Sequence, residues 1–127
     1  MPLFARSFGE PEEINRFPNG EEALITVAGR PVGLATFRPG WRWSNDLRPL
    51  VGTDSCQVHH QGYVVSGRLH VETADGSSIE VGPGDAFEIP PGHDGWAVGD
   101  EPCLMLDWGE RVREYARPAS ETAGAGR

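Results

Sequence analysis

Apolar residues recur along this chain in short runs, and glycine, proline or aspartate separates most of these runs. Short apolar runs bounded by turn residues predict β-strands rather than helices. We predict strands over residues 23–28, 32–37, 41–44, 54–58, 60–66, 69–73, 79–81, 86–89, 96–98 and 103–108. So many short strands, with turns every few residues, favour a sandwich or a barrel.

The two ends of the chain differ from this pattern. Residues 1–20 are polar and interrupted by proline, and we interpret them as an N-terminal arm that adds a short strand or lies across a partner. Residues 21–116 form the predicted barrel domain, with one short helix over 109–116. Alanine, serine and glycine dominate residues 117–127, which therefore bury too little surface to order themselves and form a predicted disordered tail.

Composition narrows the function classes. The 127 residues suit one domain, and a net charge of −8 argues against binding to nucleic acid or to anionic membranes, because both need a basic surface. No secretory leader is recognisable at the N-terminus and no apolar run is long enough for a membrane span, so we expect a cytoplasmic protein. The two cysteines, Cys56 and Cys103, do not suggest a disulfide framework.

Two stretches share the turn chemistry of a known family. Residues 63–71, YVVSGRLHV, place Gly67 between two strands, and residues 82–92, GPGDAFEIPPG, carry Gly84, Pro90 and Gly92 at fixed spacing. Together they resemble the two sequence motifs of the cupin superfamily. The resemblance implies an all-β fold, a double-stranded β-helix or jelly-roll barrel with one pocket, and a homodimer.

The resemblance also implies where metal ligands would stand, since a typical cupin uses three histidines and one glutamate. Aligned on the glycine of the first motif, its two histidines correspond to Asp54 and Cys56, and its glutamate corresponds to His60. The histidine of the second motif corresponds to Gly95, and His93 lies two residues earlier. None of the four positions keeps the residue of the family.

Two interpretations of these replacements stay open. In the first, Cys56, His60 and His93 bind a divalent metal, and the soft thiolate favours zinc or iron. In the second, the barrel holds no metal and Cys56 is a small buried apolar residue. His60 would then act as a general acid or base, because its ordinary pKa lies near neutrality, and Asp54 would orient it.

Four further residues are candidates for a substrate pocket. Trp43 and Trp96 lie near the expected barrel mouth, where aromatic rings can stack on a planar or sugar-like ligand. Gly62 shares the inward side of its strand with His60, so its missing side chain would widen the pocket. Gly95 is assigned to the same pocket. The alternative for the tryptophans is that they are core or dimer contacts.

These observations favour a small-molecule enzyme that acts in the barrel pocket, either with a metal on non-standard ligands or by histidine acid–base chemistry. The alternative is a non-catalytic module that binds or senses a small molecule, and a weaker one is a structural dimer module. The fold hosts many chemistries, so it does not identify a substrate or a reaction class.

Overall fold

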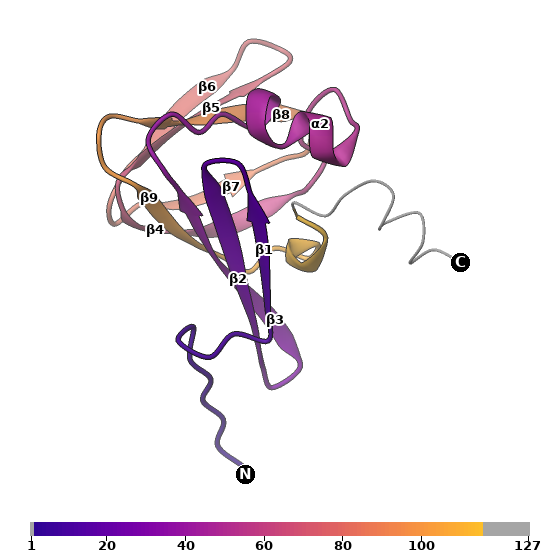
Figure 1. The fold of residues 1–127 in the computed structure, drawn as a ribbon, viewed down its shortest axis with the longest axis vertical. Coiled ribbons are helices and arrows are strands. Elements are labelled where there is room, and N and C mark those ends of the chain that lie inside the picture. Colours follow the sequence, from indigo (N-terminus) through magenta and orange to yellow (C-terminus); the bar gives the residue numbers. More distant parts are fainter. Residues whose placement is uncertain (1, 116–127) are drawn as a thin grey trace.

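The computed structural model describes residues 2–115 and arranges them in antiparallel sheets (Figure 1). Its strands are β1 (Glu13–Phe17), β2 (Gly20–Val27), β3 (Arg30–Phe37), β4 (His60–Ser66), β5 (Arg68–Thr73), β6 (Ser78–Val81), β7 (Ala86–Ile89), β8 (His93–Val98) and β9 (Cys103–Asp107). Two short helices, α1 (Trp43–Asp46) and α2 (Arg48–Val51), lie between β3 and β4. A single 3₁₀ turn, η1 (Val112–Glu114), follows β9.

The strands form two sheets that enclose one apolar core. One sheet has the order β1-β2-β3-β9-β4-β7 and the other has the order β6-β5-β8. Strands that are neighbours in space are often distant in sequence, as in the pairing of β3 with β9 and of β4 with β7. This arrangement is the jelly-roll barrel that the sequence predicts, and the fold class is confirmed.

Alternating side chains of both sheets meet inside the barrel. Leu69 and Val71 on β5 are buried, as are Phe87 and Ile89 on β7. The residues between them face outward and are polar or half-buried, which is the period of two expected of a strand with one buried face. These two strands therefore each turn one apolar side toward the core.

Two predicted strands are wrong. Residues 41–44 turn into α1 at Trp43, because the backbone carbonyl of Trp43 accepts a hydrogen bond from Leu47 and the Asp46 carboxylate accepts one from the amide of Arg42 at 2.9 Å. Residues 54–58 form an irregular segment in which only Cys56 makes a bridge, to His93. Apolar alternation alone does not distinguish such a segment from a strand.

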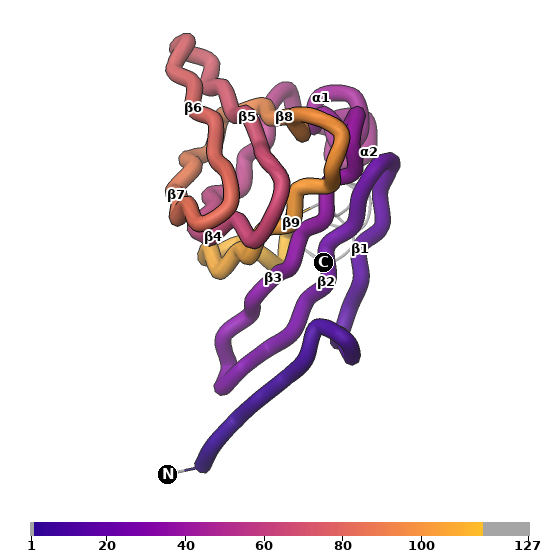
Figure 2. Tube along the Cα trace, turned by 90° about the vertical axis from the view of Figure 1, so that its left-hand side faces the viewer, coloured from indigo at the N-terminus to yellow at the C-terminus, as the bar shows by residue number. Residues whose placement is uncertain are grey.

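The ends of the described chain refine the predicted boundaries. The N-terminal arm contributes β1, which pairs with β2 at the edge of the larger sheet, while the residues before it leave the body of the protein (Figure 2). The predicted helix over 109–116 is reduced to η1, and residue 116 and the predicted tail lie outside the described residues. No helix within residues 2–115 is long and apolar enough to cross a membrane.

Strands β4 and β9 approach each other unusually closely at Gly62. A β-carbon at this position would lie 1.8 Å from the carbonyl oxygen of Leu106 and 2.8 Å from Cζ of Phe87. Only glycine permits this approach. Gly62 is therefore required by packing between the two strands.

Candidate metal centre

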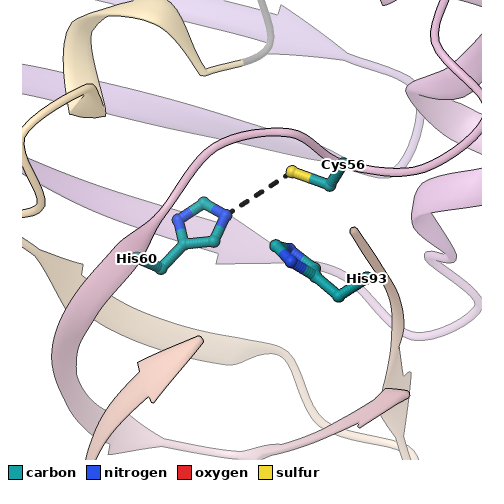
Figure 3. Close-up of side chains that lie close together, drawn as sticks. All are labelled: Cys56, His60 and His93. Atoms are coloured by element: carbon teal, nitrogen blue, oxygen red, sulfur yellow. Dashed lines mark hydrogen bonds between the residues drawn. The ribbon is translucent and has the colours of Figure 1, made fainter. Parts of the chain in front are cut away.

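Three side chains converge inside the barrel, two of them four residues apart and the third from a distant part of the chain (Figure 3). Cys56 precedes β4, His60 begins β4 and His93 begins β8. One potential ligand atom from each residue lies within 4.8 Å of the others, and all three residues are buried. The structure therefore brings together the three residues for which the sequence predicts a metal.

Backbone hydrogen bonds hold Cys56 beside His93. The amide of Cys56 donates to the carbonyl of His93 at 2.8 Å, and the amide of Gly92 donates to the carbonyl of Cys56 at 2.7 Å. His60 is paired with Ile89 across β4 and β7. Backbone pairing therefore brings the three residues to one place in the barrel.

Each histidine uses its Nδ1 atom away from the cluster. Nδ1 of His60 donates to Oδ2 of Asp107 at 2.5 Å, and Nδ1 of His93 donates to the carbonyl of Pro90 at 2.7 Å. A carbonyl and a carboxylate accept and do not donate, so both Nδ1 atoms carry hydrogen. Nε2 of each ring is left as the atom that can accept a metal, which is how protein metal sites commonly orient histidine ligands.

The spacing of the ligand atoms suits a tetrahedral ion. Sγ of Cys56 lies 3.6 Å from Nε2 of His60. Bonds of roughly 2.3 Å to sulfur and 2.05 Å to nitrogen, at a tetrahedral angle, place two ligand atoms about 3.6 Å apart. The donor set and this distance fit zinc or iron(II), with three protein ligands and one open position.

Cys56 and His60 perturb each other electrostatically. Burial raises the pKa of the Cys56 thiol, but hydrogen bonds and charges from His60 and His93 outweigh burial and lower that pKa to about 6. Burial lowers the pKa of His60, but its bonds to Asp107 and Cys56 outweigh burial and raise that pKa to about 10. At neutral pH the metal-free cluster therefore holds a thiolate beside an imidazolium.

The histidines face a small internal cavity of about 20 Å³. Phe37, Trp41, Trp43, His60, Leu69, Val71, Ile89, His93, Gly95, Met105 and Tyr115 line it. This volume is about the space that one water molecule needs. It accommodates a fourth ligand of that size and is too small for a substrate of many atoms.

Tyr115 packs against the cluster just after η1. Its ring lies edge-on to the His60 ring, with 5.2 Å between the centroids, and it also contacts Phe17 and Phe37. Burial, together with nearby acidic charges, raises the pKa of the Tyr115 hydroxyl well above its usual value. The phenol is therefore a neutral group at this end of the cavity.

The carboxylate bonded to His60 belongs to Asp107, and the prediction that Asp54 orients His60 is wrong. Asp54 is exposed because its segment is irregular and does not keep the strand parity that would turn it inward. The sequence does contain a signal for Asp107: it follows Cys103 and Met105 at the alternating, buried positions of β9. An acidic residue in phase with buried apolar residues indicates an inward carboxylate. No comparable pattern marks Tyr115.

The predicted pocket residues separate into two groups. Trp43 and Gly95 line the cavity. Gly62 does not line it, because Leu106 and Phe87 occupy the space beside it, and so it does not widen a pocket. Trp96 does not line it either, because it points to the outer face of β8.

On that outer face Trp96 takes part in a small stack. Its ring stacks on His70 with 4.3 Å between the centroids, and the Arg42 guanidinium lies 4.4 Å from its centroid on the ring face. Tyr63 also occupies the outer face of β4, and His59, just before β4, bonds Glu88 at 3.1 Å. These side chains belong to the surface of the barrel.

Comparison with known proteins agrees with this architecture. A cupin domain model matches residues 52–109, and no curated protein matches the sequence. Among solved structures, a protein of unknown function from Rhizobium leguminosarum bv. viciae 3841 is 18% identical, with a TM-score of 0.59, over 87% of this chain and 100% of that chain. KdgF from Halomonas sp. is 24% identical, with a TM-score of 0.51, over 76% of this chain and 84% of its own. At these identities the likeness establishes the fold alone.

Proposed function

Because this chain belongs to the cupin superfamily, we propose that it is a small-molecule enzyme that holds one zinc or iron(II) ion on Cys56, His60 and His93. One observation carries the proposal: both histidines are bonded through Nδ1, which leaves Nε2 of each ring as its potential ligand atom in the cluster with Cys56, and Nε2 of His60 lies 3.6 Å from the Cys56 sulfur. A buried histidine whose only role is to pack in the core, with its polar atoms hydrogen-bonded, does not need to direct its second nitrogen to the same point as another histidine. Two oriented rings and one thiol around a single point are what a metal site requires.

When bound, the ion would supply a Lewis acid, or a metal suited to oxygen chemistry if it is iron, with one position open to water or substrate. The chain's own residues perform the supporting tasks. Asp107 keeps the proton of His60 on Nδ1, so that Nε2 stays available. The apolar walls of the cavity exclude bulk water, and Tyr115 keeps a neutral phenol beside His60.

Metal content tests the proposal directly. The parent protein and the Cys56→Ala and Cys103→Ala variants are purified, loaded with zinc or iron(II), dialysed and subjected to elemental analysis. Cys103 is the matched control, because it is also a free and buried cysteine but lies on β9 outside the cluster. We expect about one ion per chain in the parent and in Cys103→Ala, and a large loss in Cys56→Ala.

Cobalt substitution adds a spectroscopic criterion. Cobalt(II) bound to a thiolate gives a ligand-to-metal charge-transfer band, which we expect in the parent and in Cys103→Ala and not in Cys56→Ala. A parent that binds no ion under any of these loadings, or a Cys56→Ala variant that retains all of it, would refute the ligand assignment.

A second candidate is metal-free chemistry at the same residues. Cys56, His60 and Asp107 form a chain of contacts, 3.6 Å from sulfur to nitrogen and 2.5 Å from nitrogen to oxygen, which is the arrangement of a nucleophile, a base and an orienting carboxylate. His60 would then act as the acid or base. In this alternative His93 only helps to stabilise the Cys56 thiolate, whereas a metal would also use the Nε2 atom that the bond from Nδ1 to Pro90 leaves available, and we therefore prefer the metal.

A further inference from the structure

A groove of about 260 Å³ opens between β6 and β7, which lie on the same side of the barrel (Figure 2). Its lining comes from β5, β6, β7 and the turn after β5: Val71, Thr73, Asp75, Ser77, Ser78, Ile79, Glu88, Ile89 and Pro90. Strand β6 is an edge of the smaller sheet and β7 is an edge of the larger one. The groove therefore marks the place where the two sheets do not close on each other.

The sheet register explains why an apolar side chain is left open here. Ile79 on β6 lies directly opposite Val71 on β5, so both side chains point to the inner face of the smaller sheet. Val71 is 3% exposed, whereas Ile79 is 47% exposed. The larger sheet ends at β7 and does not reach far enough to cover Ile79. The floor of the groove is thus a piece of barrel interior that faces solvent.

This groove shares its walls with the candidate metal centre. Val71 and Ile89 line both the groove and the internal cavity. Ile89 is also the strand partner of His60, and Thr73 is the strand partner of His93. The side chains of Val71 and Ile89 therefore separate the solvent-exposed groove from the internal cavity beside His60 and His93.

The internal cavity holds about one water molecule, so a substrate of ordinary size needs a second compartment. We propose that the groove between β6 and β7 receives the substrate of the proposed metal centre, and that Val71 and Ile89 are the gate through which its reacting end reaches the histidines. This inference rests on the proposed function, since it assigns a substrate route to that centre. The groove approaches the roughly 300 Å³ at which small-molecule sites begin.

The rim of the groove indicates the chemical class of that substrate. Two of its residues are carboxylates: Asp75, which accepts hydrogen bonds from Thr73 and from the amide of Ser77, and Glu88, which is bonded to His59. Ser77 and Ser78 add hydroxyl groups. Among the described residues that line the groove there is no lysine or arginine. Carboxylates repel an anion and accept hydrogen bonds from hydroxyl or amino groups. The substrate is therefore an uncharged or cationic molecule with hydroxyl or amino groups beside an apolar face.

The route is tested in the metal-free protein by the rate at which a small thiol reagent, methyl methanethiosulfonate, labels Cys56. Peptide mass analysis distinguishes Cys56 from Cys103. The variant Ile79→Trp fills the groove, and Val65→Trp is the matched control, since Val65 is also 47% exposed but lies outside the groove. We expect Ile79→Trp to slow labelling of Cys56 by about tenfold, because only local opening of the chain then admits the reagent. The control is expected to react like the parent.

A second pair of variants tests the gate by enlarging it. Ile89→Val removes one methyl group from the gate, and Ile25→Val removes one from a buried site on β2, which controls for general loosening of the barrel. We expect faster labelling of Cys56 in Ile89→Val only. If Ile79→Trp and Val65→Trp react equally fast, or if Tyr115→Leu alone accelerates labelling, the substrate enters elsewhere and the proposed route is wrong.

These outcomes are independent of metal binding. A parent that binds no ion but shows the expected labelling pattern would retain the route and lose the proposed metal centre. A parent that binds an ion but labels equally in all variants would retain the metal centre and lose the route.

The ligand class is tested with three probes that share one ring: cyclohexylamine, cyclohexanol and cyclohexanecarboxylate. Chemical shifts of the amides of β6 and β7 report binding in the groove. We expect the amine and the alcohol to bind. We expect the affinity of the carboxylate to be at least about tenfold below that of the amine, because the two rim carboxylates repel it. We also expect Ile79→Trp to abolish binding and Glu88→Gln to reduce the preference for the amine. A carboxylate that binds as tightly as the amine would overturn the assignment of charge.

Discussion

Replacing Gly62 with alanine tests whether this glycine serves packing or a pocket. The sequence assigns Gly62 and Gly95 to the same pocket, whereas the structure places Gly62 against β9 and Gly95 on the cavity. We therefore expect Gly62→Ala to lower the free energy of unfolding and Gly95→Ala to change it little. The two substitutions add the same methyl group, so their comparison isolates the surroundings.

The size of the effect follows from the contact distances. A β-carbon at Gly62 would lie 1.8 Å from the Leu106 carbonyl oxygen, and real β-carbons essentially never approach closer than 3.0 Å, so the strands must separate by the difference, 1.2 Å. Overpacking of this kind costs about 3 kcal/mol. With a urea slope of about 2 kcal/mol/M, the unfolding midpoint falls by about 1.5 M. The melting temperature falls by roughly 12 °C for a domain of this size.

Urea unfolding followed by tryptophan fluorescence measures this change. In Gly95→Ala the nearest atoms to the new methyl group are the His70 carbonyl oxygen at 3.2 Å and Cγ2 of Val71 at 3.7 Å, so we expect a loss below about 1 kcal/mol. A Gly62→Ala variant whose midpoint lies within the error of the parent, with an unchanged slope, would show that β4 and β9 are not packed as described.

Three more predictions concern the site and the surface. The two carboxylate oxygens of Asp107 accept from His60 and from the backbone amide of Gly109, the latter at 2.9 Å, and the single side-chain oxygen of Asp107→Asn cannot serve both donors. The ring proton of His60 then moves to Nε2, and the limiting zinc affinity falls by about 10–100-fold. Competition with a chromogenic chelator measures this loss, and the exposed variant Asp54→Asn, the control, is expected to bind zinc like the parent. Since the pKa of Cys56 is lowered to about 6 and that of His60 is raised to about 10, metal must displace one proton from His60 between these pH values. The apparent affinity for zinc therefore rises about tenfold per pH unit between these two pKa values, and more steeply at lower pH. An affinity that does not change with pH in the same competition assay would contradict the ion pair between Cys56 and His60. Trp96→Ala removes an outer-face stack and lowers stability by about 1–2 kcal/mol in thermal unfolding, but leaves zinc affinity unchanged.

Much of the fold follows from local patterns in the sequence. The predicted strands at residues 60–66 and 86–89 agree with β4 and β7 at both ends. Gly67 follows the first strand, and turn residues lie on both sides of the second. The errors at 41–44 and 54–58 have a different origin. In both segments apolar residues are buried by contacts with distant strands, which local alternation does not report.

The site could be predicted only in part for the same physical reason. Cys56, His60 and His93 were found because motif spacing places them near one another. Asp107 acts on His60 across 47 positions of sequence, and such a contact depends on the pairing of β4 with β9. The groove at Ile79 depends on where the larger sheet ends, which no local pattern encodes.

The replaced ligands preserve the charge of the site although they change its chemistry. Three neutral histidines and one glutamate carry one negative charge, and so do two neutral histidines and the Cys56 thiolate. The buried carboxylate of Asp107 adds a second negative group, and a divalent ion would then make the loaded centre neutral. Without the ion, the imidazolium of His60 offsets only one of the two negative charges. An uncompensated buried charge is costly, and a divalent ion at the proposed centre would remove this cost from the cluster of Cys56, His60, His93 and Asp107.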